Sequence, residues 1–143
     1  MKKILCIAAL TLLTASCHRY SITFNDATVY QPTALFSDYL VTDEALSKCL
    51  SQSIVDQKIY SAKELRVLRC SHGGISAVDG LSRFTHLAVL NLSNNQLTNI
   101  VEIGQLKHLS HLDLTGNRQL NCANTKQLSN KVSQLILPKH CNN

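Results

Sequence analysis

Residues 86–117 read HLAVLNLSNNQLTNIVEIGQLKHLSHLDLTGN, and they contain the pattern Leu-x-x-Leu-x-Leu-x-x-Asn twice. The two copies begin at Leu87 and Leu109 and therefore lie 22 residues apart. A period of this length is typical of repeat proteins, in which one unit is too small to bury its own apolar side and is covered by its neighbours. The segment therefore predicts a stack of similar turns.

The same period extends beyond these two copies and defines eight columns in steps of 22 from Leu65. The columns are Leu65, Leu87 and Leu109; Leu68, Leu90 and Leu112; Cys70, Leu92 and Leu114; Gly73, Asn95 and Asn117; Ile75 and Leu97; Val78, Ile100 and Cys122; Leu81 and Ile103; and Phe84, Leu106 and Leu128. A fourth, partial copy starts one residue late at Val132, with His140 in the asparagine position. The alternative is accidental leucine spacing in a helical bundle, which eight aligned columns argue against.

The Leu-x-Leu part of each copy alternates as a β-strand does, so successive turns should pair as a short parallel sheet. The Asn that follows sits where the chain turns away from the strand. Its amide can bond backbone groups that the bend leaves unpaired, and stacked Asn side chains can continue this role between turns. Gly73 lacks such a side chain, which suits a first turn that another element covers.

The motifs LRVLRCSHGGI, LAVLNLSNNQL and LSHLDLTGNRQL resemble the leucine-rich repeat family, in its 22-residue type found in internalin-like bacterial surface proteins. The resemblance covers residues 65–137. It implies an α/β fold: a short leucine-rich repeat solenoid of three to four turns, with parallel strands on its concave face and an N-terminal helical cap. Residues 138–143 form the C-terminal end.

A helix is predicted upstream, in VTDEALSKCLSQSIVD (residues 41–56). Thr42 is the expected N-cap, with Asp43 and Glu44 in the first turn, where negative charge suits the helix dipole. One face of the helix is apolar and should pack on the first repeat. That face comprises Leu46, Cys49, Leu50 and Ile54. We therefore assign residues 41–64 to the cap.

The N-terminal MKKILCIAALTLLTASC has a basic head, an apolar core and small residues before Cys17. It has the build of a secretory signal (residues 1–16), and its end resembles the lipobox of bacterial lipoproteins. That resemblance implies acyl chains, palmitate among them, on Cys17, and an exported chain anchored to a bacterial membrane, the outer membrane in a Gram-negative host. The alternative is an ordinary signal peptide cut near Ser16. Residues 17–40 would form the lipidated cysteine and its tether, whose residues 20–30 are strand-like without clear alternation.

Six cysteines are present, of which Cys6 leaves with the signal and Cys17 takes lipid. The other four allow three pairings, and spacing alone does not choose among them. Their places in the expected fold do suggest neighbours. Cys49 on the cap face should meet Cys70 in the first repeat, and Cys122 on the third turn should meet Cys141 beyond the last strand. An exported chain favours such disulfides.

Little in the sequence indicates catalysis, and we expect neither an enzyme nor a cofactor. Without Lys2 and Lys3 the chain has 12 basic against 9 acidic residues, a net charge of about +3 that is too scattered to predict nucleic-acid binding. His86 and His108 should stack in adjacent turns, and His111 and Asp113 should point the same way. Either pair could contribute to a metal site, but exposed polar surface is the favoured interpretation, so we expect no metal.

The functional hypothesis is the concave face, where positions three, five, seven and eight of each copy should point outward. The candidate partner-binding residues are Val67, Arg69, Ser71, His72, Val89, Asn91, Ser93, Asn94, His111, Asp113, Thr115, Gln134, Ile136 and Lys139. This mixture suits a protein partner better than a small molecule, and we expect the chain itself to be a monomer. The alternatives are an accessory lipoprotein for periplasmic assembly or a secretion machine, a metal-binding envelope protein, and a purely structural role.

Overall fold

The computed structural model describes residues 22–30 and 33–142, and the chain divides into two compact units between Thr33 and Ala34. The expected signal segment 1–16 and the expected lipidation site Cys17 lie outside the described residues. Among the helices in the part of the chain that is described, none is long and apolar enough to cross a membrane.

The first unit contains an antiparallel hairpin of β1 (Ile22–Phe24) and β2 (Ala27–Tyr30). Asn25 and Asp26 form its two-residue turn with φ angles of 48° and 60°. Asn and Asp tolerate this left-handed conformation, which suits the twist of a tight hairpin. Because the flanking residues do not alternate clearly, the sequence pattern alone does not predict the hairpin.

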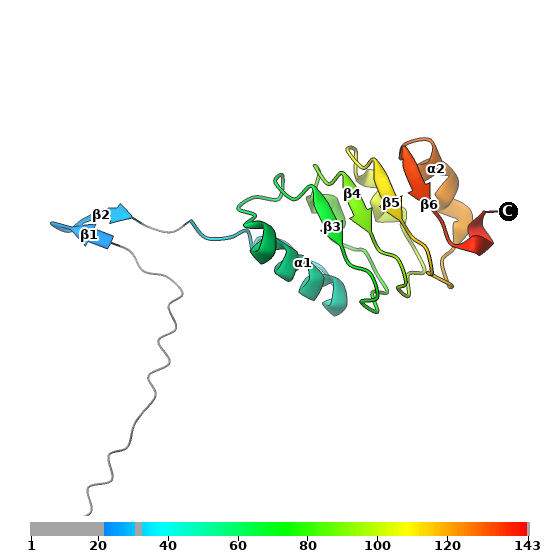
Figure 1. Cartoon of the computed structure of the whole chain (residues 1–143), viewed down its shortest axis with the longest axis horizontal. Helices are drawn as coiled ribbons and strands as arrows, with labels where there is room; N and C mark the ends of the chain where they lie inside the picture. Colours follow the sequence, from blue (N-terminus) through cyan, green and yellow to red (C-terminus); the bar gives the residue numbers. More distant parts are fainter. Residues whose placement is uncertain (1–21, 31–32, 143) are drawn as a thin grey trace, which may run out of the picture. The chain divides into compact units, whose positions relative to one another are not determined.

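The second unit is built on a four-stranded parallel sheet in the order β3 (Val67–Arg69), β4 (Val89–Asn91), β5 (His111–Asp113) and β6 (Gln134–Ile136) (Figure 1). The predicted period sets the register, since Leu68 pairs with Leu90 and Leu90 with Leu112. Leu112 pairs with Leu135, which absorbs the one-residue delay of the fourth copy. The sequence columns are therefore spatial rows across the sheet.

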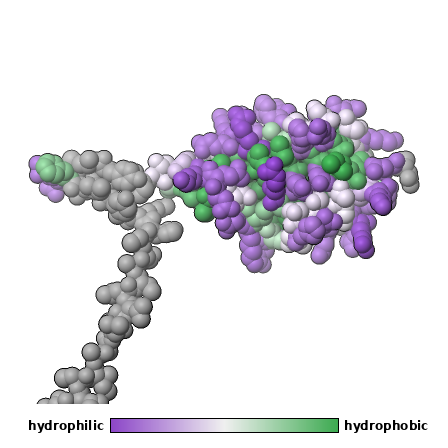
Figure 2. Space-filling model, viewed as in Figure 1, coloured by the Kyte–Doolittle hydropathy of each residue, from purple (hydrophilic) through white to green (hydrophobic). Residues whose placement is uncertain are grey.

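Short helices connect the strands: η1 (Leu81–Arg83), η2 (Val101–Gln105), η3 (Cys122–Asn124) and α2 (Thr125–Ser129), with η4 (Lys139–Cys141) after β6. The apolar columns are buried between these connections and the sheet, and the side chains of Leu68, Leu90 and Phe84 are at most 1 % exposed. Hydrophilic residues surround hydrophobic patches on the face seen in Figure 2. The core is thus continuous from turn to turn, as stacking requires.

Helix α1 (Glu44–Gln57) precedes the sheet and buries Leu46, Leu50 and Ile54. Its N-cap is Asp43, in extended conformation, whose Oδ1 accepts a hydrogen bond of 2.9 Å from the Leu46 N–H. The prediction of Thr42 as N-cap is therefore wrong. Thr42 lies one residue too early for its side chain to reach the first free N–H groups of the helix, whereas the Asp43 carboxylate is placed to accept from N3.

The second carboxylate oxygen of Asp43 ties α1 to the first repeat. Its Oδ2 accepts hydrogen bonds from the N–H and Oγ of Ser76, both at 2.8 Å, and from the N–H of Ala77 at 3.2 Å. Burial of the carboxyl raises its pKa, but the hydrogen bonds from Leu46, Ser76 and Ala77 outweigh burial and hold the pKa of Asp43 below its usual 3.8. One side chain therefore begins the helix and fixes it to the following loop.

Residues 34–40, which the sequence places in the tether, belong to the second unit. The Phe36 N–H donates to Ile59 O at 2.9 Å, and the Phe36 and Tyr39 rings pack on Phe84 with ring centroids 6.0 and 5.8 Å apart. Asp38 forms an ion pair with Arg83. Three aromatic rings from two separate segments therefore extend the core beyond the first repeat.

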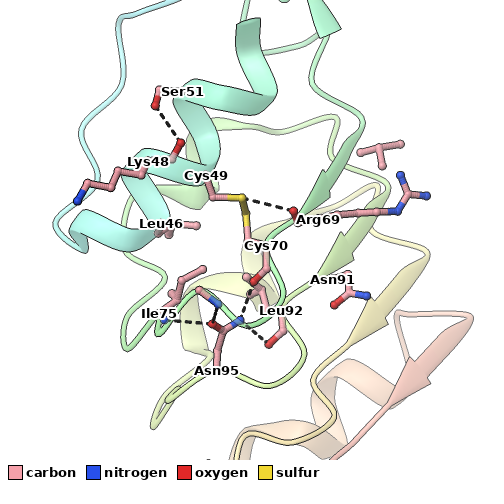
Figure 3. The surroundings of a disulfide bond; sticks show 12 residues. Leu46, Lys48, Cys49, Ser51, Arg69, Cys70, Ile75, Asn91, Leu92 and Asn95 are labelled. Carbon is pink, nitrogen blue, oxygen red and sulfur yellow. Dashed lines mark hydrogen bonds between the residues drawn. A yellow bond between two sulfur atoms is a disulfide. The ribbon is translucent and has the colours of Figure 1, made fainter. Parts of the chain in front are cut away.

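Two cysteine pairs lie at disulfide-bonding distance, and they are the pairs that the sequence suggests. Cys49 of α1 joins Cys70, just after β3, with Cα atoms 5.9 Å apart (Figure 3). Cys122 of η3 joins Cys141 of η4, with Cα atoms 5.3 Å apart. The first bridge links the helix to the first repeat, and the second closes the chain around the last strand.

Asn95 connects the first two turns from a buried position (Figure 3). Its Nδ2 donates to Cys70 O at 2.7 Å in the turn before it and to Leu92 O at 2.9 Å in its own turn. Its Oδ1 accepts from the N–H groups of Gly73 and Ile75. Because Asn95 reaches backward, the first turn needs no side chain at Gly73.

Asn117 repeats this role one turn later. Its Nδ2 donates to Leu92 O and Leu114 O at 2.9 and 2.8 Å, and its Oδ1 accepts from the Leu97 N–H. His140, which the pattern puts in the same position of the fourth copy, behaves differently. Its exposed ring places Nε2 3.0 Å from Leu120 O rather than near the strand carbonyls. The asparagine ladder therefore joins the first three turns only.

We predict that Asp43→Ala lowers the free energy of unfolding by about 2 kcal/mol, because it removes the N-cap and the bonds to Ser76 and Ala77 together. Asp43→Asn should cost less, since an amide oxygen still caps the helix while its NH₂ group cannot accept from Ser76. Urea unfolding followed by circular dichroism at pH 7 measures both differences.

The same variants carry a pH test. A carboxylate whose pKa is lower in the folded than in the unfolded state stabilises the fold above its unfolded pKa, and this contribution is lost as the pH falls through the folded pKa. The difference in free energy of unfolding between wild type and Asp43→Ala should therefore become smaller below pH 3.8. If this difference stays the same in acid, the ionised Asp43 carboxylate is not the stabilising group.

Candidate functional site

The outward side chains of the four strands form two rows, which we call the strand face. The register aligns Val67, Val89, His111 and Gln134 in one row and Arg69, Asn91, Asp113 and Ile136 in the other. Neighbouring strands lie about 4.8 Å apart, so each row spans roughly 14 Å. The alternate residues Leu68, Leu90 and Leu112 point into the core, which explains why the outward positions are free to vary in chemistry.

The strand face combines charge with apolar surface. Arg69 is exposed, and Asp113 lies two strands away and is half-buried. Val67 and Val89 are half-buried beside them, and Ile136 is 54 % exposed on the last strand. Hydrophobic patches with hydrophilic surroundings are visible in Figure 2. Separated charges of opposite sign around aliphatic groups suit a protein surface of complementary charge.

Asn91 and Asp113 also hold the turns that follow their strands. Asn91 Oδ1 accepts from the N–H of Ser93 at 2.9 Å and from its Oγ at 2.7 Å, and Asp113 Oδ1 accepts from the Thr115 N–H at 2.9 Å. Ser93 is thereby drawn inward and is only 7 % exposed. The prediction that Ser93 faces a partner is therefore wrong: its hydroxyl is used within the turn.

The loops beyond the strands carry a further column with left-handed backbone. His72, Asn94 and Gly116 follow one another at the 22-residue period with φ angles of 57°, 56° and 78°. Backbone bonds join these loops, since His72 N–H donates to Ser93 O and Asn94 N–H donates to Thr115 O. A Cβ on Gly116 would lie 2.2 Å from Asn94 Oδ1. The recurrent conformation leaves Ser71, His72, Asn94 and Thr115 exposed beside the strand face.

The imidazole of His111 is oriented by its neighbour. Its Nδ1 lies 2.8 Å from Ser110 Oγ, and that hydroxyl donates to Ala88 O at 3.1 Å. The contact with Ser110 fixes the orientation of the ring, which presents Nε2 outward as a polar group. The strand face thus carries an oriented imidazole between Val89 and Gln134.

The fourth copy completes the candidate surface differently from the others. Gln134 and Ile136 are exposed on β6, and Lys139 lies exposed in η4 rather than in a left-handed loop. Lys139 is therefore beyond the end of the strand face, next to the Cys122–Cys141 bridge.

In the part of the chain that the structure describes, none of the candidate metal ligands belongs to a group of three. The rings of His86 and His108 pack edge to face with centroids 5.0 Å apart. In the described ranges, one group of three possible ligands lies close together, namely Cys122, His140 and Cys141. The two sulfurs are bonded to each other, so neither is available as the thiolate that binds zinc.

A hollow that the sequence did not indicate lies among the loops of the first two turns, away from the strand face. Its volume is about 490 Å³, and its lining includes Asp79, Thr98, Val101 and Glu102. Glu102 Oε1 accepts from the N–H groups of Gly80 and Ser82 at 2.9 and 3.0 Å, so its carboxylate already has a structural role at the start of η1. No spacing of reactive residue types in the sequence signals this hollow.

Residues 63–118 match the family model described as Leucine rich repeat. The match supports a leucine-rich repeat protein, and the parallel sheet with its short helices fits an α/β repeat fold. Domains of this family commonly mediate protein–protein binding and are typically non-enzymatic binding modules. A search of curated proteins found no match to the chain.

We predict that Gly116→Ala lowers the free energy of unfolding by about 1–3 kcal/mol, because it combines a left-handed backbone with a collision against Asn94. Gly104→Ala is the control, since no neighbour lies within 4 Å of the added Cβ. Thermal melts compare the two variants.

Gly116→Ala should cost less stability in an Asn94→Ala background than in wild type, because Asn94→Ala removes the side-chain oxygen from the collision but leaves the backbone strain at position 116. Equal melting temperatures of the Gly116→Ala and Gly104→Ala variants would show that a Cβ at position 116 causes neither strain nor a collision.

Proposed function

We propose that this chain is a non-enzymatic lipoprotein that binds a protein partner through the strand face, which forms the concave side of a short leucine-rich repeat solenoid. The observation that carries the proposal is the alignment of Arg69, Asn91, Asp113 and Ile136 in one row across four strands. Such a row presents a cation, an amide, an anion and an aliphatic group in fixed order. This is a recognition pattern rather than a reaction centre.

The small size of the strand face sets an upper bound on its affinity. Two rows that each span about 14 Å bury less surface than a protein interface of standard size. The exposed loop residues Ser71, His72, Asn94 and Thr115 would enlarge the contact on one side. We therefore propose a partner that contacts strands and loops together, and a chain that acts as a monomer.

Helix α1 would serve as the N-terminal cap of the solenoid. Three observations support this role: its buried residues Leu46, Leu50 and Ile54, the Cys49–Cys70 bridge, and the hydrogen bond of 3.0 Å from Gln57 Nε2 to Val67 O on β3. A stack of repeats exposes apolar surface at its ends unless another element covers it. Residues 41–64 would thus form the cap and residues 65–137 the repeats, with residues 34–40 packed beside Phe84.

Export and anchoring are part of the same proposal. Residues 1–16 would act as a signal and Cys17 would carry the acyl chains, so that the domain is held at a bacterial membrane, the outer one in a Gram-negative host. The two cysteine pairs at bonding distance suit an oxidising compartment outside the cytoplasm. Residues 18–33 would link the anchor to the domain.

The strand face is tested with Arg69→Glu/Asp113→Asn in a cross-linked pull-down from native envelope. Asn at 113 should keep the turn, because Asn91 makes the same bonds one turn earlier. The control Arg66→Glu/Asp56→Asn changes the net charge equally at exposed positions off the strand face. We expect a partner that is captured by wild type and control but on the order of tenfold less by the test variant. A partner retained equally by all three would place the binding site elsewhere.

The anchor is tested with Cys17→Ser. In a bacterial host supplied with labelled palmitate, the wild-type chain should carry label and sediment with membranes. The variant should lose nearly all label and appear in the soluble fraction, because without acyl chains only weak surface attraction holds it. An unlabelled wild-type chain would contradict lipidation of Cys17.

A further inference from the structure

Of the two edges of the four-stranded sheet, one is covered by α1 and the other is open. In β3 the carbonyls of Val67 and Arg69 point away from β4, and α1 covers both. Gln57 Nε2 donates to Val67 O, and Cys49 Sγ lies 3.4 Å from Arg69 O (Figure 3), a contact rather than a hydrogen bond because a disulfide sulfur carries no hydrogen. This edge is therefore closed to a further strand.

The opposite edge, at β6, is open. Gln134 N–H and Ile136 O bond β5, through Ser110 O at 2.9 Å and Leu114 N at 2.8 Å. Since groups alternate along a parallel strand, the N–H and C=O of Leu135 point outward. Within residues 22–30 and 33–142, nothing bonds these two groups. A row of unpaired backbone groups is a template for another strand.

The side chains at this edge are also incompletely covered. Leu135 is only partly buried, whereas its counterparts in the earlier strands, Leu68, Leu90 and Leu112, are at most 1 % exposed. Leu137 is partly buried as well, while Leu114 in the turn before is fully buried. One more strand would complete the packing of both leucines.

The charge of this end is strongly one-sided. Residues 114–142 contain Arg118, Lys126, Lys131 and Lys139 and no acidic residue. Residues 33–113, by contrast, contain seven basic and eight acidic residues. Lys131 lies three positions before β6 and Lys139 three positions after it, and both are exposed. Lys131 Nζ donates a hydrogen bond of 3.3 Å to Gly104 O in the preceding turn, and its ammonium group stays at the surface. The chain therefore carries an exposed lysine just before and just after the open edge.

We propose that the β6 edge is a second docking site, separate from the strand face, which takes an extended acidic segment of a protein partner as a fifth strand. The backbone of the segment would pair with Leu135, an apolar side chain would cover Leu135 and Leu137, and acidic residues at its two ends would meet Lys131 and Lys139. Backbone pairing supplies affinity and the flanking charges supply selectivity.

A second copy of the chain fits this edge poorly. Two β6 strands pairing antiparallel about Leu135 would bring Lys131 of one copy opposite Lys139 of the other, and like charges directly opposite are destabilising. Parallel pairing would form no closed dimer. An anionic membrane would satisfy the lysines but would leave the N–H and C=O of Leu135 unpaired. An acidic strand satisfies the charges and the backbone together.

The test uses the full chain in detergent and two fluorescent pools of nonapeptides. Both pools carry five central positions drawn from Val, Ile, Thr, Tyr and Phe, flanked at each end by Asp-Glu in one pool and by Lys-Lys in the other. Fluorescence anisotropy measures the bound fraction. The wild-type chain should bind the acidic pool and not the basic one, with Kd on the order of 100 µM, because the edge is short.

Two kinds of variant separate charge from strand pairing. Lys131→Glu/Lys139→Glu should weaken binding of the acidic pool by about tenfold, and the control Lys63→Glu/Lys107→Glu, with the same change of net charge at exposed positions, by less than about twofold. Leu135→Pro removes the outward N–H without breaking a bond to β5 and should weaken binding by about fivefold. Thermal melts check that each variant folds. If Leu135→Pro does not fold, the comparison of the two lysine variants tests the proposal by itself.

Four outcomes would overturn the proposal. They are absence of binding to the acidic pool, equal binding of both pools, an equal loss in the two lysine variants, and a folded Leu135→Pro variant that binds as wild type does. A dimer seen by sedimentation and lost in Leu135→Pro would show that a second copy of the chain binds at this edge instead. Binding to phosphatidylglycerol vesicles that depends on Lys131 and Lys139, without peptide binding, would show that the basic end binds lipid.

Discussion

A turn of 22 residues with a three-residue strand has no core of its own, and every other feature of the second unit follows from this constraint. Its leucines are buried only because the next turn lies against them, and its backbone groups at the bend are paired only because Asn95 and Asn117 reach across turns. Stacking therefore stabilises both the apolar and the polar parts of each turn. The strand face is a by-product of the same register.

The constraint makes the first and last turns special. At the first turn, Asp43, Cys49 and Gln57 each connect α1 to the first repeat or its strand edge, through a carboxylate, a disulfide and an amide. At the last turn, the Cys122–Cys141 bridge fastens the chain, but Leu135 keeps an outward N–H and C=O that nothing in the described part of the chain bonds. One end is thus closed, and the other is suited to further pairing.

The candidate site shows how structure and recognition share residues. Asn91 and Asp113 hold the turns after their strands and at the same time stand in the outward row with Arg69 and Ile136. Rigid turns keep these side chains in place, which lowers the entropy lost on binding. Ser93 also stabilises a turn: its hydroxyl donates to Asn91, and its small side chain is buried rather than exposed at the surface.

Because the central part of the protein repeats, its structure could be predicted from the sequence. The 22-residue columns determine the strands, their parallel order, the buried leucines and the outward rows. These properties depend on spacing, which a sequence displays directly. Contacts between different elements were decided only by tertiary structure. The second oxygen of Asp43, the N-cap of α1, meets Ser76 in a distant loop; Phe36 joins the core through Phe84; and β6 is left with an open edge. Such contacts join segments that share no period, so their distances arise only when the chain is folded.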